Sequence, residues 1–200
     1  MRKLIVFNRV TPEGYFASAT GQLDWVVPDD EADRAGTQAM PGADLMLFGR
    51  KTYEMFRNFW PTVEGQSAPP DPHHPGRATP AIRDFAAWIN ATAKLVVSTT
   101  LGDPGWRNAR VLPGFDPAAI AAVKRAPGQA IMVFGSGQLV TALVEHGLVD
   151  ELQLMMSPLL LGAGAPLIAG LPRRVPLALV ECKPYPTGNV MLRYALGDVR

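Results

Sequence analysis

Short apolar runs alternate with amphipathic stretches along most of the chain. The apolar runs are rich in Val, Ile, Leu, Phe and Met, which indicates buried strands. These strands are expected at 4–10, 44–48, 94–98, 130–134 and 151–156. Helices are expected between them, at 28–39, 52–60, 79–89, 116–126 and 138–146. Two further strands, at 177–182 and 190–194, flank the turn residues 186–189 and predict an antiparallel hairpin.

This order of elements predicts an α/β fold. Strands that alternate with helices usually pair in parallel and are covered by helices on both faces. We therefore expect a mostly parallel central sheet with an antiparallel hairpin at the C-terminus. Residues 11–21 and the proline-rich segment 61–79 show no apolar period and are expected to be surface loops. No repeat or linker divides the chain, so residues 1–200 form one predicted domain.

Composition argues against several classes of protein. The net charge is +1, from 19 basic and 18 acidic residues, so neither a large nucleic-acid surface nor a basic membrane-binding face is expected. The single cysteine, Cys182, cannot form an intrachain disulfide, and we expect a cytoplasmic protein. The uncharged stretch 154–172 is interrupted by prolines and glycines, which favours a buried strand and a loop over a membrane helix. His73 and His74 stand without a supporting His or Cys pattern, so no metal site is expected.

Two junctions between a strand and a helix carry residues that suit anion binding. The first is Gly49-Arg50-Lys51-Thr52, and the second is Gly135-Ser136-Gly137-Gln138 with Leu139 following. Glycine lets the backbone approach a phosphate, and the free N–H groups of a helix N-terminus favour negative charge. The second junction is not a complete dinucleotide fingerprint, because Val140 stands at the position of the third glycine. Both patterns are also typical of tight turns without a ligand.

A third expected strand ends in hydroxyl side chains. Ser98, Thr99 and Thr100 stand at the carboxyl end of this strand. Hydroxyls beside a cation suit a ribose 2′-phosphate, although the same residues are typical of a helix cap or a turn. Ligands of open α/β sheets bind at the carboxyl ends of the strands, so the three segments are expected to share one site.

Together these segments resemble the dihydrofolate reductase superfamily. The stretch "LDWVVPDD", residues 23–30, is similar to the Leu-x-Trp segment before the first helix of that superfamily. The stretches "EGYFA" at 13–17 and "VDELQLMMSPLLLGAGAPLI" at 149–168 resemble one branch, the reductase domain of the bifunctional riboflavin-biosynthesis deaminase-reductase. Glu13 replaces the usual Asp of that branch. The resemblance covers nearly the whole chain.

The resemblance implies a cofactor, a reaction and a set of site residues. It implies NADPH, which we expect to be preferred over NADH, and hydride transfer to a small ring or C=N bond. The cofactor-binding residues that it implies are Gly49, Arg50, Lys51, Thr52, Ser98, Thr99, Thr100, Gly135, Ser136, Gly137, Gln138 and Leu139. For the substrate, it implies binding by Asn8 and Trp25.

A proton must also reach the substrate nitrogen, and two carboxylates are candidates for its donor. Asp30 lies five residues after Trp25, at the distance of the carboxylate that takes this part in dihydrofolate reductases. Asp29 and Asp30 are also typical of residues that cap a helix and offset its dipole. Glu13 is the second candidate, and its neighbour Pro12 departs from the pattern of the family.

Three functions are compatible with these residues. The first is an NADPH-dependent reductase of a ribosylaminopyrimidine or another small heterocycle, of the type that reduces 5-amino-6-(5-phosphoribosylamino)uracil. The others are a dihydrofolate or pteridine reductase and a non-catalytic nucleotide-binding dimer. A zinc deaminase is not expected, because no H-x-E pattern with P-C-x-x-C is present. A homodimer is expected through Leu159–Leu161 and Leu167–Ile168, unless these side chains pack beneath the sheet.

Overall fold

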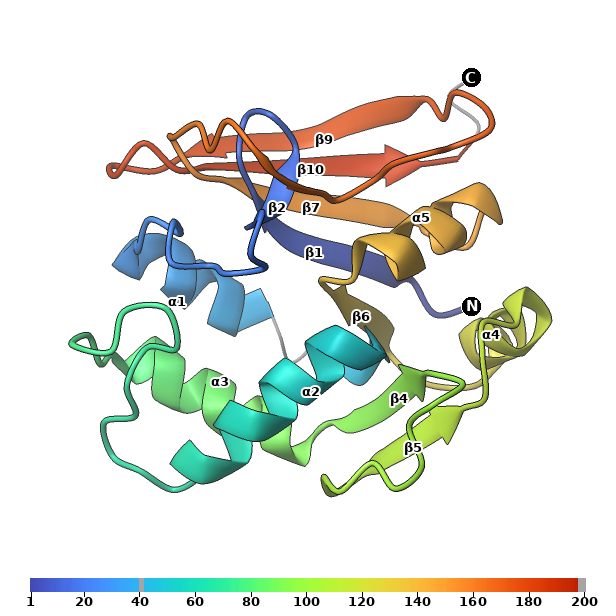
Figure 1. Cartoon of the computed structure of the whole chain (residues 1–200), viewed down its shortest axis with the longest axis horizontal. Helices are drawn as coiled ribbons and strands as arrows, with labels where there is room; N and C mark the ends of the chain where they lie inside the picture. Colours follow the sequence, from blue (N-terminus) through green and yellow to red (C-terminus); the bar gives the residue numbers. More distant parts are fainter. Residues whose placement is uncertain (40–41, 198–200) are drawn as a thin grey trace.

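An eight-stranded sheet forms the centre of the computed structural model, which describes residues 1–39 and 42–197 (Figure 1). Its strand order is β5-β4-β3-β6-β1-β7-β10-β9. The strands are β1 (Leu4–Val10), β3 (Ala43–Gly49), β4 (Ala93–Val97), β5 (Ala109–Leu112), β6 (Ala130–Phe134), β7 (Glu151–Met156), β9 (Leu177–Pro184) and β10 (Val190–Leu196). Strands β1 and β3 to β7 pair in parallel, whereas β10 runs antiparallel to both β7 and β9. The predicted parallel sheet with an antiparallel C-terminal hairpin is confirmed.

Helices cover both faces of the sheet. The helices are α1 (Asp30–Ala39), α2 (Arg50–Phe59), α3 (Pro80–Ala91), α4 (Pro117–Arg125) and α5 (Gly137–Glu145). On one face, α2 and α3 pack against alternate side chains such as Met46, Phe48 and Phe134. On the other face, α4 and α5 pack against the intervening side chains, among them Leu47 and Val133. The strands therefore read as continuous apolar runs, because both of their faces are buried.

Helix α2 begins two residues earlier than the sequence predicts. The expected start was Thr52, but the helix begins at Arg50, directly after the last residue of β3. Helix α5 likewise begins at Gly137, one residue before the expected start. Both basic residues of the first junction, Arg50 and Lys51, therefore belong to the first turn of α2, where a helix has free N–H groups.

A small second sheet was not predicted. Strand β2 (Tyr15–Ser18) pairs antiparallel with β8 (Gly164–Pro166), although residues 11–21 were expected to be a loop. A Cβ atom on Gly164 would lie 2.6 Å from the carbonyl oxygen of Ala17, so glycine permits this pairing. Strand β5 was also missed, and its four residues are too few to give a clear apolar period.

The uncharged stretch 154–171 is mostly packed against the sheet. Leu167 is buried, and Ile168 packs against the same core, as the alternative reading predicts for these two residues; Leu154 and Leu171 pack there as well. Leu160 differs, since 73% of its surface is exposed. No helix in residues 1–39 or 42–197 combines the length and the apolar character that a bilayer crossing requires.

Candidate cofactor and substrate cleft

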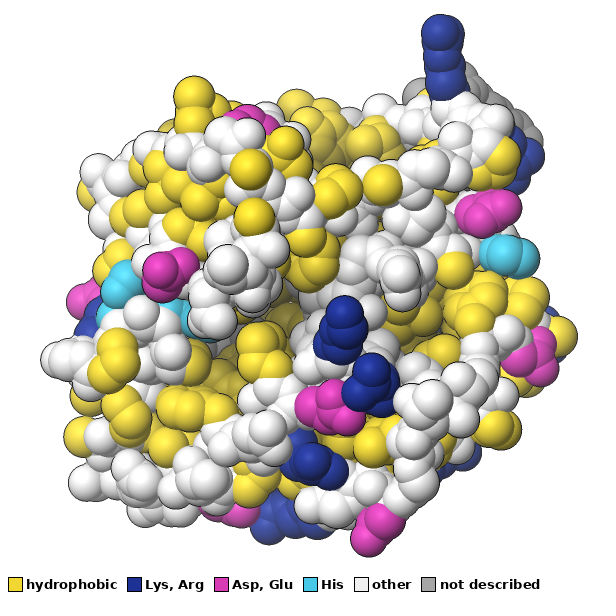
Figure 2. Space-filling view, viewed as in Figure 1, with side chains coloured by type: hydrophobic (Ala, Val, Ile, Leu, Met, Phe, Trp, Pro, Cys, Tyr) yellow, Lys and Arg dark blue, Asp and Glu magenta, His cyan; other side chains and the backbone are white. Residues whose placement is uncertain are grey.

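A cleft of about 1480 Å³ lies at the carboxyl ends of the parallel strands. Residues that end strands β3, β4 and β6 line it, namely Gly49, Val97 and Phe134. Figure 2 shows a hollow in the middle of this face, with apolar side chains inside it, histidines towards one end and basic side chains towards the other. A concave, largely apolar site with few polar groups is typical of a small-molecule site.

The two predicted anion-binding junctions lie directly against each other. A Cβ atom on Gly49 would come within 2.9 Å of the Cβ atom of Ser136. A Cβ atom on Gly135 would come within 2.9 Å of the Thr52 hydroxyl. Gly135 and Ser136 both have left-handed backbone, with φ of +59° and 61°. This conformation is uncommon for serine, and such residues gather at ligand sites.

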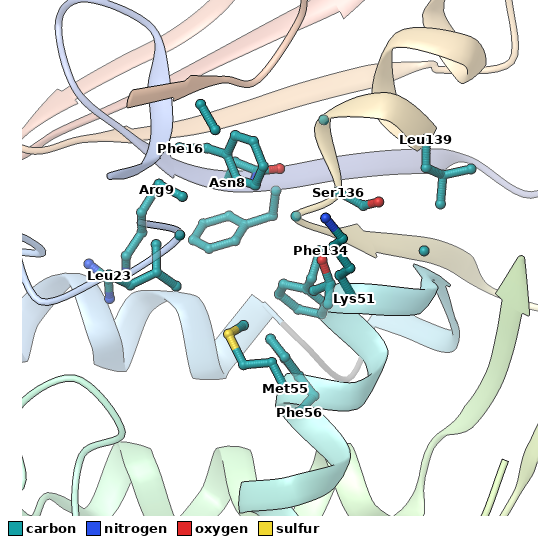
Figure 3. Close-up of a pocket in the computed structure, with 18 of the residues that line it drawn as sticks. Asn8, Arg9, Phe16, Leu23, Lys51, Met55, Phe56, Phe134, Ser136 and Leu139 are labelled. Atoms are coloured by element: carbon teal, nitrogen blue, oxygen red, sulfur yellow. The ribbon is translucent and has the colours of Figure 1, made fainter. Parts of the chain in front are cut away.

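The first turns of α2 and α5 are open to an anion. The residues that precede these helices, Gly49 and Ser136, make no side-chain capping hydrogen bond. Uncapped N–H groups and the helix dipole favour a negative group at such a position. Arg50 donates to Glu54 at 3.0 and 3.2 Å, whereas no carboxylate in the described residues pairs with Lys51. In Figure 3 the Lys51 side chain points towards Ser136.

Of the three hydroxyl residues after β4, Ser98, Thr99 and Thr100, the first has a structural role. The Ser98 hydroxyl accepts hydrogen bonds from the amides of Thr100 at 3.1 Å and Leu101 at 3.0 Å. Ser98 is therefore a turn residue, as one of the two sequence readings predicts. Thr99 and Thr100 are exposed and line the cleft, and the Thr100 hydroxyl is 3.5 Å from that of Ser98, so both hydroxyls can face a ligand.

The space beside Gly137 is filled by protein atoms, although the sequence suggested that it would accommodate a diphosphate. A Cβ atom there would meet the carbonyl oxygens of Pro166 at 2.8 Å and Leu167 at 3.1 Å, and the Phe16 ring at 3.1 Å. Gly137 thus lets β8 and β2 pack onto the start of α5. The sequence suggested that this glycine makes room for a diphosphate, but protein atoms already fill that room.

The remaining cofactor candidates, Gln138 and Leu139, also line the cleft, with Leu139 almost fully buried. Asn8, a candidate substrate residue, lies on β1 and lines the cleft beside Phe16 (Figure 3). Its Oδ1 atom is buried and has no hydrogen-bond partner in the described part of the chain. An unpaired buried polar atom is costly, and a bound ligand would satisfy it.

Trp25 does not line the cleft, although the sequence assigned it to the substrate. It is buried, and its indole nitrogen donates to the carbonyl oxygen of Gln22 at 3.2 Å. Leu23 and Val26, on either side of it, line the cleft instead. Trp25 therefore supports the loop that carries these two residues.

Neither of the two candidate proton donors, Asp30 and Glu13, lines the cleft. The contacts of Asp30, of Glu13 and of the neighbouring Asp29 show why. Asp29 is the residue that caps α1, since its carboxylate accepts the Ala32 amide at 2.8 Å. Asp30 forms an ion pair with Arg77, and 65% of its side chain is exposed. Glu13 accepts the amides of Leu161 at 2.7 Å and Gly162 at 2.9 Å, so it braces the loop that leads to β8. These contacts account for the positions of Asp30 and Glu13 without a role in proton transfer.

The cleft instead contains a cluster of charges that the sequence did not reveal. Asp33 accepts from Arg9 at 2.8 Å and from Arg77 at 2.7 Å, and Asp71 also accepts from Arg77 at 2.7 Å. All four residues line the cleft, together with His73. Arg77 thereby joins the proline-rich loop to α1.

Ionisation within this cluster follows from its contacts. Burial opposes ionisation of Asp71, but the His73 amide and the Arg77 guanidinium outweigh it and lower the pKa of the carboxyl. Burial, together with the charge of Arg9, lowers the pKa of His73, so its imidazole is neutral at pH 7. Burial also acts on Arg77, yet its carboxylate partners raise the pKa of its guanidinium.

The sequence model of the RibD C-terminal domain matches residues 2–191. This chain belongs to the RibD C-terminal domain family. Two Bacillus subtilis (strain 168) proteins are similar over most of their lengths, and both are uncharacterized. YyaP is 26% identical over 197 residues, 96% of this chain and 94% of YyaP, and YwjB is 23% identical over 192 residues, 92% of each chain.

Solved structures of RibD-like proteins share the fold. A Shewanella sp. PV-4 protein, provisionally assigned to riboflavin biosynthesis, has a TM-score of 0.73 and 21% identity over 98% of this chain and 99% of its own. A Thermotoga maritima diaminohydroxyphosphoribosylaminopyrimidine deaminase/5-amino-6-(5-phosphoribosylamino)uracil reductase has a TM-score of 0.64 and 11% identity. The match covers 98% of the chain described here and 57% of the Thermotoga chain. The predicted dihydrofolate reductase-like fold is confirmed.

Proposed function

We propose that the protein is an NADPH-dependent reductase that transfers a hydride to a small planar heterocycle. The observation that carries this proposal is the pair of uncapped helix N-termini, those of α2 and α5, which meet across one cleft. Lys51 lies beside them, and no carboxylate among the described residues pairs with it. This end of the cleft, from Gly49 to Thr52 and from Gly135 to Leu139, is called the cofactor half below. The family supports the reductase assignment, because its members include RibD-type reductases.

The residues of the cofactor half fit a dinucleotide. Amide groups at the two helix N-termini suit the diphosphate, and Lys51 adds a positive charge beside them. Thr99 and Thr100 offer hydroxyls at the end of β4, which suit the additional phosphate that distinguishes NADPH from NADH. When bound, the nicotinamide of this cofactor supplies the hydride.

The other end of the cleft suits a flat ring and is called the substrate half. It lies between β1 and α1 and is lined by Arg9, Asp33, Asp71 and Arg77, with apolar neighbours such as Leu23. The apolar side chains exclude water from a bound ring. The charged groups at its border fix the orientation of that ring through directed hydrogen bonds.

Proton transfer in this half does not rest on a carboxylic acid. Asp71 accepts hydrogen bonds from the His73 amide and the Arg77 guanidinium, which lower the pKa of its carboxyl although burial opposes this. Asp71 is thus a poor proton donor at neutral pH, and the carboxylate oxygens of Asp33 are held by Arg9 and Arg77. We infer that these residues hold and orient the substrate and that the proton comes from water.

Cofactor turnover tests this proposal. NADPH should bind in a saturable manner, and its near-ultraviolet absorbance should fall when pyrimidine, pteridine or other C=N acceptors are added. The non-catalytic alternative predicts binding without oxidation by any acceptor. A protein that binds neither NADPH nor NADH would refute the proposal.

A further inference from the structure

The substrate half of the cleft has no excess of positive charge. Two guanidinium groups, those of Arg9 and Arg77, face three carboxylates. Arg77 alone contacts Asp30, Asp33 and Asp71, and Arg9 shares Asp33. Asp30 does not line the cleft, so the charges that do, those of Arg9, Arg77, Asp33 and Asp71, sum to zero.

Arg77 is already committed to its carboxylate partners, and Arg9 donates to Asp33 through Nη2. Arg77 donates to Asp33 and Asp71 at 2.7 Å each, and both carboxylates are largely buried. An incoming phosphate would have to displace a carboxylate that stays nearby, and the repulsion between the two anions would oppose binding. Lys51, in the cofactor half, has no such competitor among the described carboxylates.

We propose that the substrate is an uncharged or cationic ring without a phosphate or carboxylate group. This inference rests on the proposed reductase function and concerns the same cleft. Phosphate recognition is then confined to the cofactor half, and the substrate half selects by shape and by neutral hydrogen bonds. A phosphorylated ribosylaminouracil is a poor substrate for such a site.

Two unpaired polar atoms indicate what the ring offers. The Nη1 atom of Arg9 is buried without a partner in the described residues, so it suits a carbonyl oxygen or a ring nitrogen. The Oδ1 atom of Asn8 is also buried and unpaired, and it suits an N–H group. The two side chains leave neighbouring positions of β1, with Arg9 directed towards α1 and Asn8 lying beside Phe16 (Figure 3). Successive side chains of a strand point to opposite faces, so each atom indicates a polar group of the bound molecules at its own position.

Binding of a simple phosphate ester tests this charge argument. Ribose 5-phosphate is titrated calorimetrically into protein that is saturated with NADPH, so that the cofactor half is occupied. We expect no binding up to millimolar concentration. A complex with one ribose 5-phosphate per chain and a submillimolar Kd would overturn the proposal.

Two matched variants show whether Asp33 causes the exclusion. Asp33→Asn removes one negative charge inside the cleft and leaves Arg9 unpaired, so the affinity for ribose 5-phosphate should rise about ten-fold or more. Asp30→Asn removes the same charge from an exposed side chain that does not line the cleft, and a smaller gain is expected. Equal gains in the two folded variants, or none, contradict the role of Asp33. If Asp33→Asn fails to fold, the ribose 5-phosphate titration of the wild-type protein still shows whether the substrate half excludes a phosphate.

A matched pair of acceptors tests the same inference in turnover. We expect kcat/KM for 5-amino-6-ribosylaminouracil to exceed that for its 5′-phosphate by about ten-fold or more, because the phosphate meets the carboxylate cluster. A preference for the phosphorylated compound would overturn the inference while supporting the reductase function. Failure of NADPH to bind would instead remove the proposed function, and it is distinguishable because a preference for the phosphorylated compound is seen only in a protein that oxidises NADPH.

Discussion

Replacement of Lys51 by methionine should weaken cofactor binding without affecting the fold. Lys51 is exposed in the first turn of α2, and its side chain points towards Ser136 (Figure 3). No hydrogen bond or ion pair holds its ammonium group among the described residues. Methionine keeps the length and the helix propensity of the side chain and removes only the charge.

The size of the effect follows from Coulomb's law. An ammonium about 4 Å from a phosphate contributes roughly 1 kcal/mol in water and roughly 4 kcal/mol at the effective dielectric constant of a protein surface. Lys51 is exposed, so a value near 1–2 kcal/mol applies, which corresponds to a Kd about 5–30 times higher. The diphosphate is common to both cofactors, so NADPH and NADH should weaken by similar factors.

Fluorescence or calorimetric titration measures this change, at low and at moderate salt. Arg50→Met is the matched control, because Arg50 is already paired with Glu54 and should contribute less. The difference between wild type and Lys51→Met should shrink as salt rises. An unchanged Kd in a folded Lys51→Met protein would refute the placement of an anion between the two helix N-termini.

Three further outcomes are expected. Gly137→Val should lower the free energy of unfolding by about 1–3 kcal/mol in urea denaturation, because its side chain would overlap the carbonyl oxygen of Pro166; a fully stable variant with weakened NADPH binding would contradict this. Burial lowers the pKa of Lys94 from 10.5 to about 8. Between these two pH values the folded state has lost the proton, whereas the unfolded state still binds it. Stability relative to Lys94→Met should therefore rise from pH 8 to 10, by about 2 kcal/mol, and a flat difference across that range would contradict the assignment. The protein should sediment as a dimer at micromolar concentration, and Leu160→Asp should shift it towards the monomer of 21.6 kDa; a wild-type monomer would refute the dimer.

The fold was largely predictable from the sequence because most of its elements are long enough to show a period. Strand β1 and strand β7 were predicted with the bounds that the structure has, since both are apolar runs between clear breaks. The pair β2 and β8 escaped notice, because strands of three or four residues with glycine and proline carry no such signal. Their pairing depends on Gly164, whose role appears only when Ala17 lies beside it.

Only those parts of the candidate site that consist of consecutive residues could be predicted from the sequence. Both junctions at helix N-termini were found, because glycine between a strand and a helix is visible in the sequence. The cluster of Arg9, Asp33, Asp71 and Arg77 was not found, since its members come from three separate segments that only the tertiary fold brings together. Asp30 and Asp33 lie one helical turn apart, and the sequence did not reveal which of the two faces the cleft.

A crystal structure with NADPH bound is the most direct test of the account. We predict the diphosphate between the N-termini of α2 and α5, close to Lys51, and the nicotinamide at the end of β1 beside Asn8 and Phe16. The substrate half, around Arg9, should remain free for a second ring. A diphosphate that binds elsewhere, or a cleft that stays empty at saturating NADPH, would contradict the central claim.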